Sequence, residues 1–338
     1  MILFTGDINL TDNAFDIGFG VGSRIKSGYN PFQFIDKKEC DLWVGNFEGV
    51  LSDKTNCTDY HRNVFRINTD AYRKITDPID IYGLANNHVM EHGDVAYSQM
   101  SEILHKTGKK VFGQNTNRSV TVLSDGKKIS ITGFSLREDG TGYSPCYWNY
   151  PEMRELEDEV RSLNEIDFRI AYIHWGVEYV DCPSVEQQKI AHWLIDIGFD
   201  LIVGMHPHVL QGFEVYKGKH IFYSLGNFIF NMTFTPSLYG AVVKLNTNDF
   251  SVSYDYVRID SEYCPHIVSE EEVPQAYRFS ILNQKIGKLM NLENYVAEAN
   301  RGLSAYQKHN RIEIIKNFHK FEKRIFFSMI KDYISRRF

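Results

Sequence analysis

The chain has 338 residues, of which 43% are hydrophobic and 24% charged, so we expect one large core or one core with a smaller addition. This composition excludes a largely disordered chain, and no apolar run approaches the ~18 residues of a membrane-spanning helix. The net charge of −6 is uneven, because residues 301–338 hold ten Lys and Arg against three Asp and Glu. The acidic remainder argues against nucleic acid as a partner, since such binding rests on basic residues that neutralise phosphates.

The five cysteines are scattered, odd in number and without a C-x-x-C pair. Scattered thiols of this kind fit a reducing compartment better than a disulfide framework. The first residues also lack the basic head and apolar stretch of a secretory signal. We therefore expect a cytoplasmic protein.

In the first half of the chain, short apolar segments end at polar residues. The pattern predicts buried strands at 2–5, 41–44 and 79–84, each followed by a glycine or a polar cluster. Asp94 is expected to cap a helix over 95–105, and a second, exposed helix is expected over 151–164.

The second half continues this alternation up to about residue 260. Strands are predicted at 168–173, 200–203 and 220–225, a helix at 184–197, and a hairpin over 240–260 around the turn sequence N-T-N-D. After Pro265 the pattern becomes helical, with little strand signal. Strands that alternate with helices predict an α/β body over 1–265, and the remainder is predicted as a basic helical C-terminal extension over 266–338.

Each predicted strand delivers its polar residues at its carboxyl end, and in α/β sheets these ends meet at one edge where ligands bind. The residues expected at this edge are Asp7, Asn9, Asn46, Glu48, Asn87, His88, His174, His206 and His208. Oxygen and imidazole donors without a thiolate suit Mn, Zn or Fe. Such a set can hold one or two divalent metal ions, and a pair of ions promotes in-line displacement at phosphorus.

Six ordered motifs carry a resemblance to a known family. They are G6-D-I-N-L, G45-N-F-E-G, L84-A-N-N-H, H174-W-G-V-E-Y, G204-M-H-P-H-V-L-Q and S224-L-G-N-F. Their order over about residues 2–230 resembles the CapA family, named for capsule and poly-γ-glutamate synthesis, which is similar to the calcineurin-like metallophosphoesterases. The resemblance implies a four-layer α-β-β-α sandwich, with two sheets between layers of helices.

Carried over motif by motif, the resemblance implies metal ligands at Asp7, Asn9, Glu48, Asn87, His174, His206 and His208. It implies that His88 donates a proton to the leaving oxygen, with Asp7 and Glu48 as the other catalytic residues. Asn9 stands where the broader superfamily has a histidine, and Glu48 where it has a bridging aspartate. These departures concern the first metal position, so a single-metal enzyme remains an alternative.

Further residues are expected to contact the substrate. Arg62 and Arg66 follow Glu48 and can clamp a phosphate or carboxylate through paired guanidinium hydrogen bonds. Glu178 can orient an imidazole or contact substrate, and Gln211 and Asn227 are expected to line the pocket.

The leading hypothesis is a metal-dependent hydrolase of a phosphate ester, or a related acyl or glycosyl-linked bond, in a surface-polymer pathway. Its substrate would be a phosphorylated or polymeric small molecule or saccharide. One alternative is a non-catalytic assembly factor that keeps the fold. Another is a zinc peptidase, because His88-Val-Met-Glu91-His92 matches H-x-x-E-H, although this segment is predicted as a loop that follows a strand.

The basic tail places Phe318, Phe321, Ile325, Met329 and Tyr333 at helical spacing. One interpretation is a helix that lies on an anionic membrane surface and makes a peripheral contact. The other, which we favour, is a helix docked on the acidic body or on another subunit.

Overall fold

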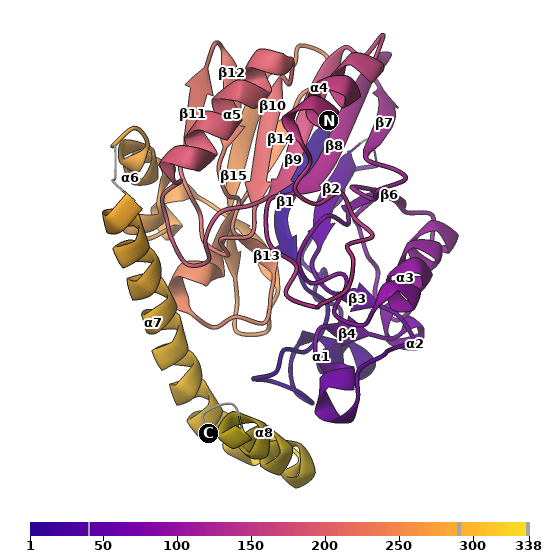
Figure 1. Cartoon of the computed structure of the whole chain (residues 1–338), viewed down its shortest axis with the longest axis vertical. Helices are drawn as coiled ribbons and strands as arrows, with labels where there is room; N and C mark the ends of the chain where they lie inside the picture. Colours follow the sequence, from indigo (N-terminus) through magenta and orange to yellow (C-terminus); the bar gives the residue numbers. More distant parts are fainter. Residues whose placement is uncertain (40, 289–291, 336–338) are drawn as a thin grey trace.

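The computed structural model describes residues 1–39, 41–288 and 292–335, with the side chains of residues 332–335 left out (Figure 1). Its larger sheet has the order β16-β15-β14-β1-β2-β5-β6, and β13 also pairs with β1. The strands of this sheet are β1 (Ile2–Ile8), β2 (Leu42–Phe47), β5 (Ile81–Gly83), β6 (Lys110–Phe112), β13 (Asn227–Ile229), β14 (Tyr239–Leu245), β15 (Val252–Ile259) and β16 (Pro265–Val268).

The second sheet has the order β11-β12-β10-β9-β8-β7. Its strands are β7 (Ser119–Ser124), β8 (Lys127–Ser135), β9 (Phe168–His174), β10 (Leu201–Met205), β11 (Phe213–Tyr216) and β12 (Lys219–Phe222). The strands β3 (Val50–Leu51) and β4 (Arg66–Ile67) pair separately. The longer helices of the body are α1 (Val21–Lys26), α3 (Asp94–Lys106), α4 (Met153–Ser162) and α5 (Val185–Ile197), with the short α2 (Thr69–Tyr72) and α6 (Phe279–Leu282).

Three apolar clusters separate four layers. Alternate residues of β1 face opposite sides, so Phe4 joins the cluster between the two sheets and Leu3 joins the cluster beneath α1 and α3. On β9, Tyr172 faces the other sheet, while Ile173 packs with the cluster under α4 and α5. The α-β-β-α sandwich expected from the resemblance is therefore confirmed.

The helix boundaries follow local capping. Ser184 accepts a hydrogen bond from the Gln187 backbone N–H at 3.0 Å and forms a capping box, which starts α5 one residue later. The expected cap at Asp94 is wrong by one residue, because Gly93 occupies that position with a φ of 84° and Asp94 is already helical.

The chain after Pro265 contains more than helices. β16 pairs antiparallel with β15, and Phe279 and Leu282 are buried in the cluster between the sheets. The sequence pattern did not predict β16, because a strand of only four residues gives a weak alternation of apolar and polar residues. The division into a body and an extension stays a prediction.

Beyond residue 291 the chain forms α7 (Leu292–Asn317), a short turn of helix and α8 (Lys323–Ser335). In Figure 1, α7 runs down one side of the body and α8 lies across the bottom of the view. Phe321 is buried and meets the Phe19 ring edge-on at 5.0 Å, so the start of the tail docks on the body. The Tyr333 side chain lies outside the described residues, as does Cys40, and the membrane contact stays a prediction. Among the described residues no helix is long and apolar enough to cross a membrane.

Candidate metal centre

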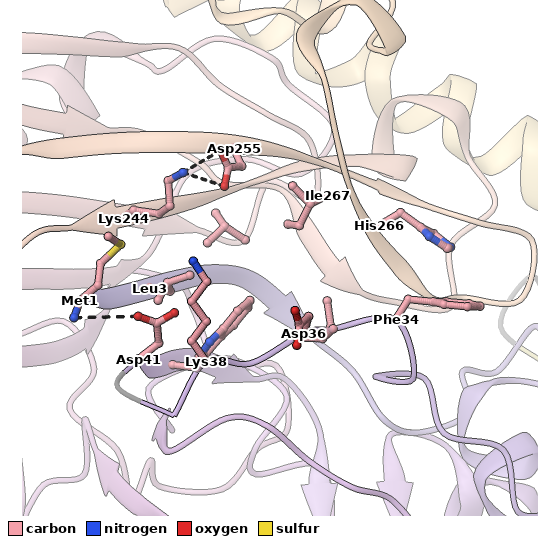
Figure 2. Close-up of a pocket in the computed structure, with 13 residues that line it drawn as sticks. Met1, Leu3, Phe34, Asp36, Lys38, Asp41, Lys244, Asp255, His266 and Ile267 are labelled. Atoms are coloured by element: carbon pink, nitrogen blue, oxygen red, sulfur yellow. Dashed lines mark hydrogen bonds and ion pairs between the residues drawn. The ribbon is translucent and has the colours of Figure 1, made fainter.

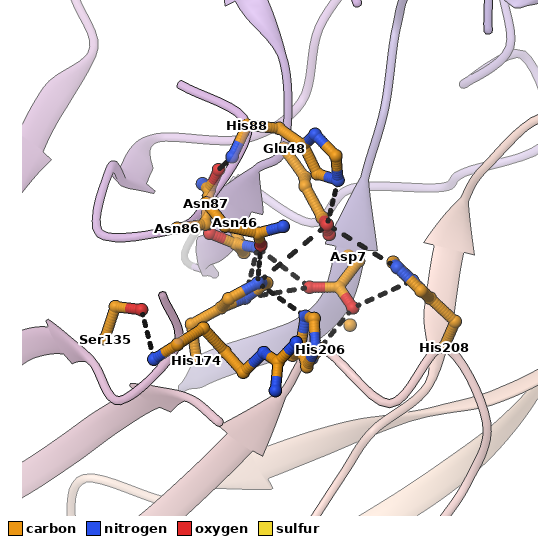
Figure 3. A network of polar contacts seen from close by, with 12 residues as sticks. Asp7, Asn46, Glu48, Asn86, Asn87, His88, Ser135, His174, His206 and His208 are labelled. Atoms are coloured by element: carbon orange, nitrogen blue, oxygen red, sulfur yellow. Dashed lines mark hydrogen bonds and ion pairs between the residues drawn. The ribbon is translucent and has the colours of Figure 1, made fainter. Parts of the chain in front are cut away.

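The carboxyl ends of four parallel strands bring the predicted residues together. Asp7 near the end of β1 lies beside Asn46 on β2, and His174 at the end of β9 lies beside Met205 of β10. His206 follows β10 directly. Figure 3 shows side chains from both sheets pointing toward one another at this edge. The convergence that the strand pattern predicted is present.

The first carboxylate of the cluster belongs to Asp7, which is fully buried. It accepts hydrogen bonds from the side-chain amide of Asn46 at 2.8 Å and from the backbone N–H of His206 at 3.1 Å. Burial raises the pKa of Asp7 to about 6, although these hydrogen bonds oppose the shift. Asp7 therefore ties β1 to both β2 and the segment after β10.

Glu48 is the second carboxylate, and its side chain is 0% exposed. Neither of its oxygens has a hydrogen-bond partner among the described residues. Burial, together with the nearby charge of Asp7, holds the pKa of Glu48 well above its usual range. A buried carboxylate without donors is costly unless a proton or a cation neutralises it.

Imidazole nitrogens surround this carboxylate. The Oε1 atom of Glu48 lies 3.6 Å from Nε2 of His208, 3.8 Å from Nε2 of His88 and 3.9 Å from Nε2 of His174. Nε2 of His174 also lies 3.0 Å from Nδ1 of His206 and 2.8 Å from the side-chain oxygen of Asn87. The donor atoms therefore crowd around a common centre.

Burial keeps these imidazoles neutral. It holds the pKa values of His174 and His206 well below the usual range and lowers the pKa of His208 to about 3. His208 Nδ1–H donates to the side-chain oxygen of Asn227 at 3.0 Å, which leaves the lone pair on Nε2 facing Glu48. A neutral ring with an oriented lone pair is the form that binds a metal ion.

Three sets of residues place their ligand atoms within 4.8 Å of one another. They are Asp7 with Glu48 and His208, Glu48 with His174 and His206, and Glu178 with His206 and His208. Glu48 belongs to two sets, as a bridging ligand would. The unpartnered oxygens of Glu48 and the unpartnered buried Nε2 of His206 fit a divalent cation, and this donor chemistry suits Mn, Zn or Fe.

The backbone is strained at this edge. His206, His208 and Tyr179 adopt φ values of 96°, 56° and 63°, a region that residues with a side chain seldom occupy. Each such residue costs about 1–3 kcal/mol, and such strain concentrates at functional sites. Position 6 has no room for a side chain, because a Cβ there would lie 2.0 Å from the carbonyl oxygen of Gly226.

Three predicted residues have partners within the protein. The side-chain oxygen of Asn9 accepts from the Thr11 backbone N–H at 2.8 Å and from the Thr11 hydroxyl at 2.6 Å, and its role as a metal ligand stays a prediction. Gln211 is fully buried, and its side-chain amide donates to the carbonyl of Val180 at 2.8 Å. Asn227 is also buried, and its side-chain oxygen lies 3.0 Å from Nδ1 of His208. Substrate contact by these two residues stays a prediction.

The predicted arginine clamp is not formed by two free guanidinium groups. Arg66 donates to the carbonyls of Arg62 at 2.6 Å and Ser52 at 2.8 Å, so it braces the segment after Glu48. Arg62 instead lines a cavity of about 330 Å³ that it shares with Glu322 and Arg324 at the start of α8.

The zinc-peptidase interpretation does not fit the geometry. The segment from His88 to His92 is a turn, so the two rings do not share a helical face. Both nitrogens of His92 are engaged, with the hydroxyl of Thr55 at 2.6 Å and the carbonyl of Val64 at 2.7 Å. The hypothesis is therefore set aside.

Sequence reasoning missed Arg137, which follows β8 at the same edge. Its positive charge helps to lower the pKa of His174 and His206, and it donates to the carbonyl of Gly176 at 3.1 Å. The available signal was the apolar run of β8 that ends at Ser135. That run has the same form as the strand ends that the sequence pattern did identify.

Fold and cluster together define the class: a two-sheet α/β protein with buried carboxylates and neutral imidazoles gathered at the carboxyl ends of its parallel strands.

The model of the family "Bacterial capsule synthesis protein PGA_cap" matches residues 1–232, and the chain belongs to this family. The resemblance to CapA is thus confirmed. The chain is 30% identical to the PGA biosynthesis protein CapA of Bacillus subtilis (strain 168) over 238 residues, which are 65% of this chain and 61% of that protein. It is 29% identical to the capsule biosynthesis protein CapA of Bacillus anthracis over 230 residues, 63% of this chain and 56% of that one.

The chain therefore spans about six-tenths of the length of these two relatives. Among solved structures, a phosphatase of Mycoplasma pneumoniae is similar with a TM-score of 0.46 and 15% identity, over 78% of this chain and 95% of that one. A TM-score below 0.5 carries no weight for activity.

Proposed function

We propose that the protein is a metal-dependent hydrolase that cleaves a phosphate ester in the synthesis of a capsule or another surface polymer. The observation that carries the proposal is the buried Glu48 carboxylate, which has neutral imidazoles around it and no hydrogen-bond donor among the described residues. Family membership supports the pathway, and the substrate class is a phosphorylated or polymeric saccharide or small molecule.

Two sets of ligands would hold the metal. Asp7, Glu48 and His208 form one, and Glu48, His174 and His206 form the other, which the side-chain oxygen of Asn87 extends. A divalent ion held here supplies Lewis acidity toward a phosphoryl oxygen and activates water at neutral pH. The ligand sets are compatible with one ion or with two.

His88 is placed to deliver a proton to the leaving oxygen. Its Nδ1 lies 2.9 Å from a carboxylate oxygen of Glu91, and its ring stacks on Phe65 with the centroids 3.9 Å apart. These contacts fix the ring so that Nε2 faces the cluster, 3.8 Å from Glu48. His88 is also partly exposed, with 17% of its side chain accessible, so a substrate can reach it from outside.

The test compares His88→Ala with the wild-type chain on two esters of different leaving-group acidity. An alkyl phosphate needs a proton on its leaving oxygen, so turnover should fall about 10²- to 10⁴-fold. Turnover of p-nitrophenyl phosphate should fall far less, because nitrophenolate leaves unprotonated. His105→Ala, on the exposed side of α3, serves as the matched control and should change neither rate.

Metal content is measured on the same samples. His88→Ala should keep the wild-type content, whereas His206→Ala should lose both metal and turnover. A wild-type chain that hydrolyses neither ester, and takes up no Mn²⁺ or Zn²⁺ on titration, would contradict the proposal.

A non-catalytic assembly factor remains the second candidate, and it is favoured by Thr11, which occupies the side-chain oxygen of Asn9 with two hydrogen bonds. In that role the cluster would bind a polymer or a partner enzyme without turnover. If His88→Ala fully restored capsule formation in a strain that lacks the gene, the assembly role would replace the catalytic one.

A further inference from the structure

One face of α7 packs on the loop that connects β9 to α5. Tyr295 and Ala299 on this face pack with Val180 and Cys182 of the loop. The same face continues through Gly302, Tyr306 and His309, which follow at helical spacing. In Figure 1, α7 runs beside this side of the body.

The contact is close at Gly302. A Cβ at this position would lie 2.6 Å from the carbonyl oxygen of Tyr179, so the helix backbone rests directly on that residue. One turn later the ring of Tyr306 stacks on the ring of Tyr179, with the centroids 4.0 Å apart and the planes at 20°. Nε2 of His309 then lies 2.8 Å from the hydroxyl of Thr233, on the neighbouring loop.

Tyr179 connects this contact to the metal cluster. Its backbone N–H donates to the carbonyl of Pro207 at 2.8 Å, between His206 and His208, and its ring lies 6.3 Å from the ring of His208. Its φ of 63° is unfavourable for a residue with a side chain, so packing must hold it there. The preceding residue is Glu178, whose carboxylate oxygen lies within 4.8 Å of ring nitrogens of His206 and His208.

We propose that α7 positions Glu178 for metal binding, because Tyr306 and Gly302 hold the strained Tyr179 that directly follows Glu178. The inference rests on the proposed metal site and adds to it a residue from outside the family match, which ends at residue 232. Tyr306 is a positioning residue, because its ring stacks on Tyr179 and it acts through that residue.

The experiment titrates the full chain, stripped of metal by a chelator, with Mn²⁺ or Zn²⁺ alone. Tyr306→Ala should weaken metal binding about tenfold, as loss of a residue that orients a ligand commonly does. Tyr306→Phe keeps the stacked ring and loses only the hydroxyl that hydrogen-bonds Tyr179, so the loss should be smaller than in Tyr306→Ala. Gln307→Ala, one residue further on the exposed side of α7, is the matched control and should bind as wild type.

A double variant separates positioning from general weakening of the fold. Glu178→Gln should itself weaken binding, and adding Tyr306→Ala to it should produce little further loss, because both act through the same carboxylate. Hydrogen exchange of residues 177–182 should be faster in Tyr306→Ala. If Tyr306→Ala does not fold, His309→Ala provides a milder test, with a smaller loss in the same direction.

The outcomes are distinct. A wild-type chain that binds no metal overturns the proposed function itself. If the wild-type chain binds metal and Tyr306→Ala binds it equally well, only the role of α7 is overturned. The same holds if the losses of affinity in Glu178→Gln and Tyr306→Ala add fully in the double variant.

Discussion

The two ends of the larger sheet hold charged side chains in opposite ways. At the amino ends of β1 and β2 lies a cavity of about 430 Å³, shown in Figure 2, where Lys244 forms two hydrogen bonds of 2.8 Å with Asp255. The amino group of Met1 lies 4.0 Å from the carboxylate of Asp41 at the same end. These charges are partly exposed and each meets an opposite charge.

At the carboxyl ends the carboxylates of Asp7 and Glu48 are fully buried among neutral imidazoles. Ordinary surface pairing explains the first end and contributes ~0–1 kcal/mol per pair. It does not explain the second, because a buried unpaired carboxylate destabilises the fold. The contrast therefore marks the place where the proposed cation would bind, and the following changes test it.

The largest effect is expected for Glu48→Gln, which removes the carboxylate shared by two ligand sets. Metal affinity should fall at least ~100-fold, because loss of a residue that only supports a ligand already costs about 10- to 100-fold and loss of a ligand itself should cost more. The metal-free variant should unfold no more easily than the metal-free wild type, because an unpaired buried charge has gone. Calorimetric titration and thermal unfolding check both. The control is Asp255→Asn at the amino end of the sheet, which should leave metal affinity unchanged. A fall in metal affinity in this variant would mean that the two ends of the sheet do not differ in metal binding.

Asn227→Ala should produce the next largest effect. Asn227 fixes the ring of His208 through a 3.0 Å hydrogen bond, so its loss should weaken metal binding ~10- to 100-fold. Metal titration measures the change, with the exposed hairpin residue Asn248→Ala as control. An unchanged affinity would mean that His208 is not a ligand.

Acid should weaken metal binding. The pKa of Asp7 is raised to about 6, so a proton competes with the metal for this carboxylate below that pH. Without metal, the stability that Asp7 gains from its raised pKa is present below 3.8 and is lost as the pH rises through about 6. The rise in melting temperature on adding metal should therefore grow between pH 5 and pH 7, with affinity changing about tenfold per pH unit for each competing proton. A gain independent of pH would point to binding elsewhere.

The smallest effect is expected at the amino end. Lys244→Met breaks a partly exposed pair, so the free energy of unfolding should fall by at most ~1 kcal/mol and metal content should not change. Denaturant unfolding at low and high salt checks this, because the wild-type advantage should shrink as salt screens the pair.

The ends of the strands could be predicted from the sequence. Buried strands are apolar, and glycine or a cluster of polar residues begins where the chain leaves the core. That pattern correctly brought Asp7, His174 and His206 to one edge. It could not tell which way a short amide turns, so it did not predict that Asn9 would meet Thr11 or that Asn227 would meet His208.

Contacts between distant segments were also beyond reach of the sequence pattern. The stacking of Tyr306 on Tyr179 joins residues far apart in the chain, and nothing in the helical spacing of α7 specifies its partner. Glycine is unfavourable in the interior of a long helix, and the close approach of Gly302 to Tyr179 gives the reason for it at this position.

We expect one cation or two between the carboxylates and imidazoles at this edge. Anomalous scattering from crystals of the untreated protein, recorded across the Mn and Zn absorption edges, should show a peak that contacts Glu48 together with His206 or His208. Well-ordered Glu48 and His206 side chains without such a peak, in crystals soaked with Mn²⁺ and Zn²⁺, would rule out the proposed metal site.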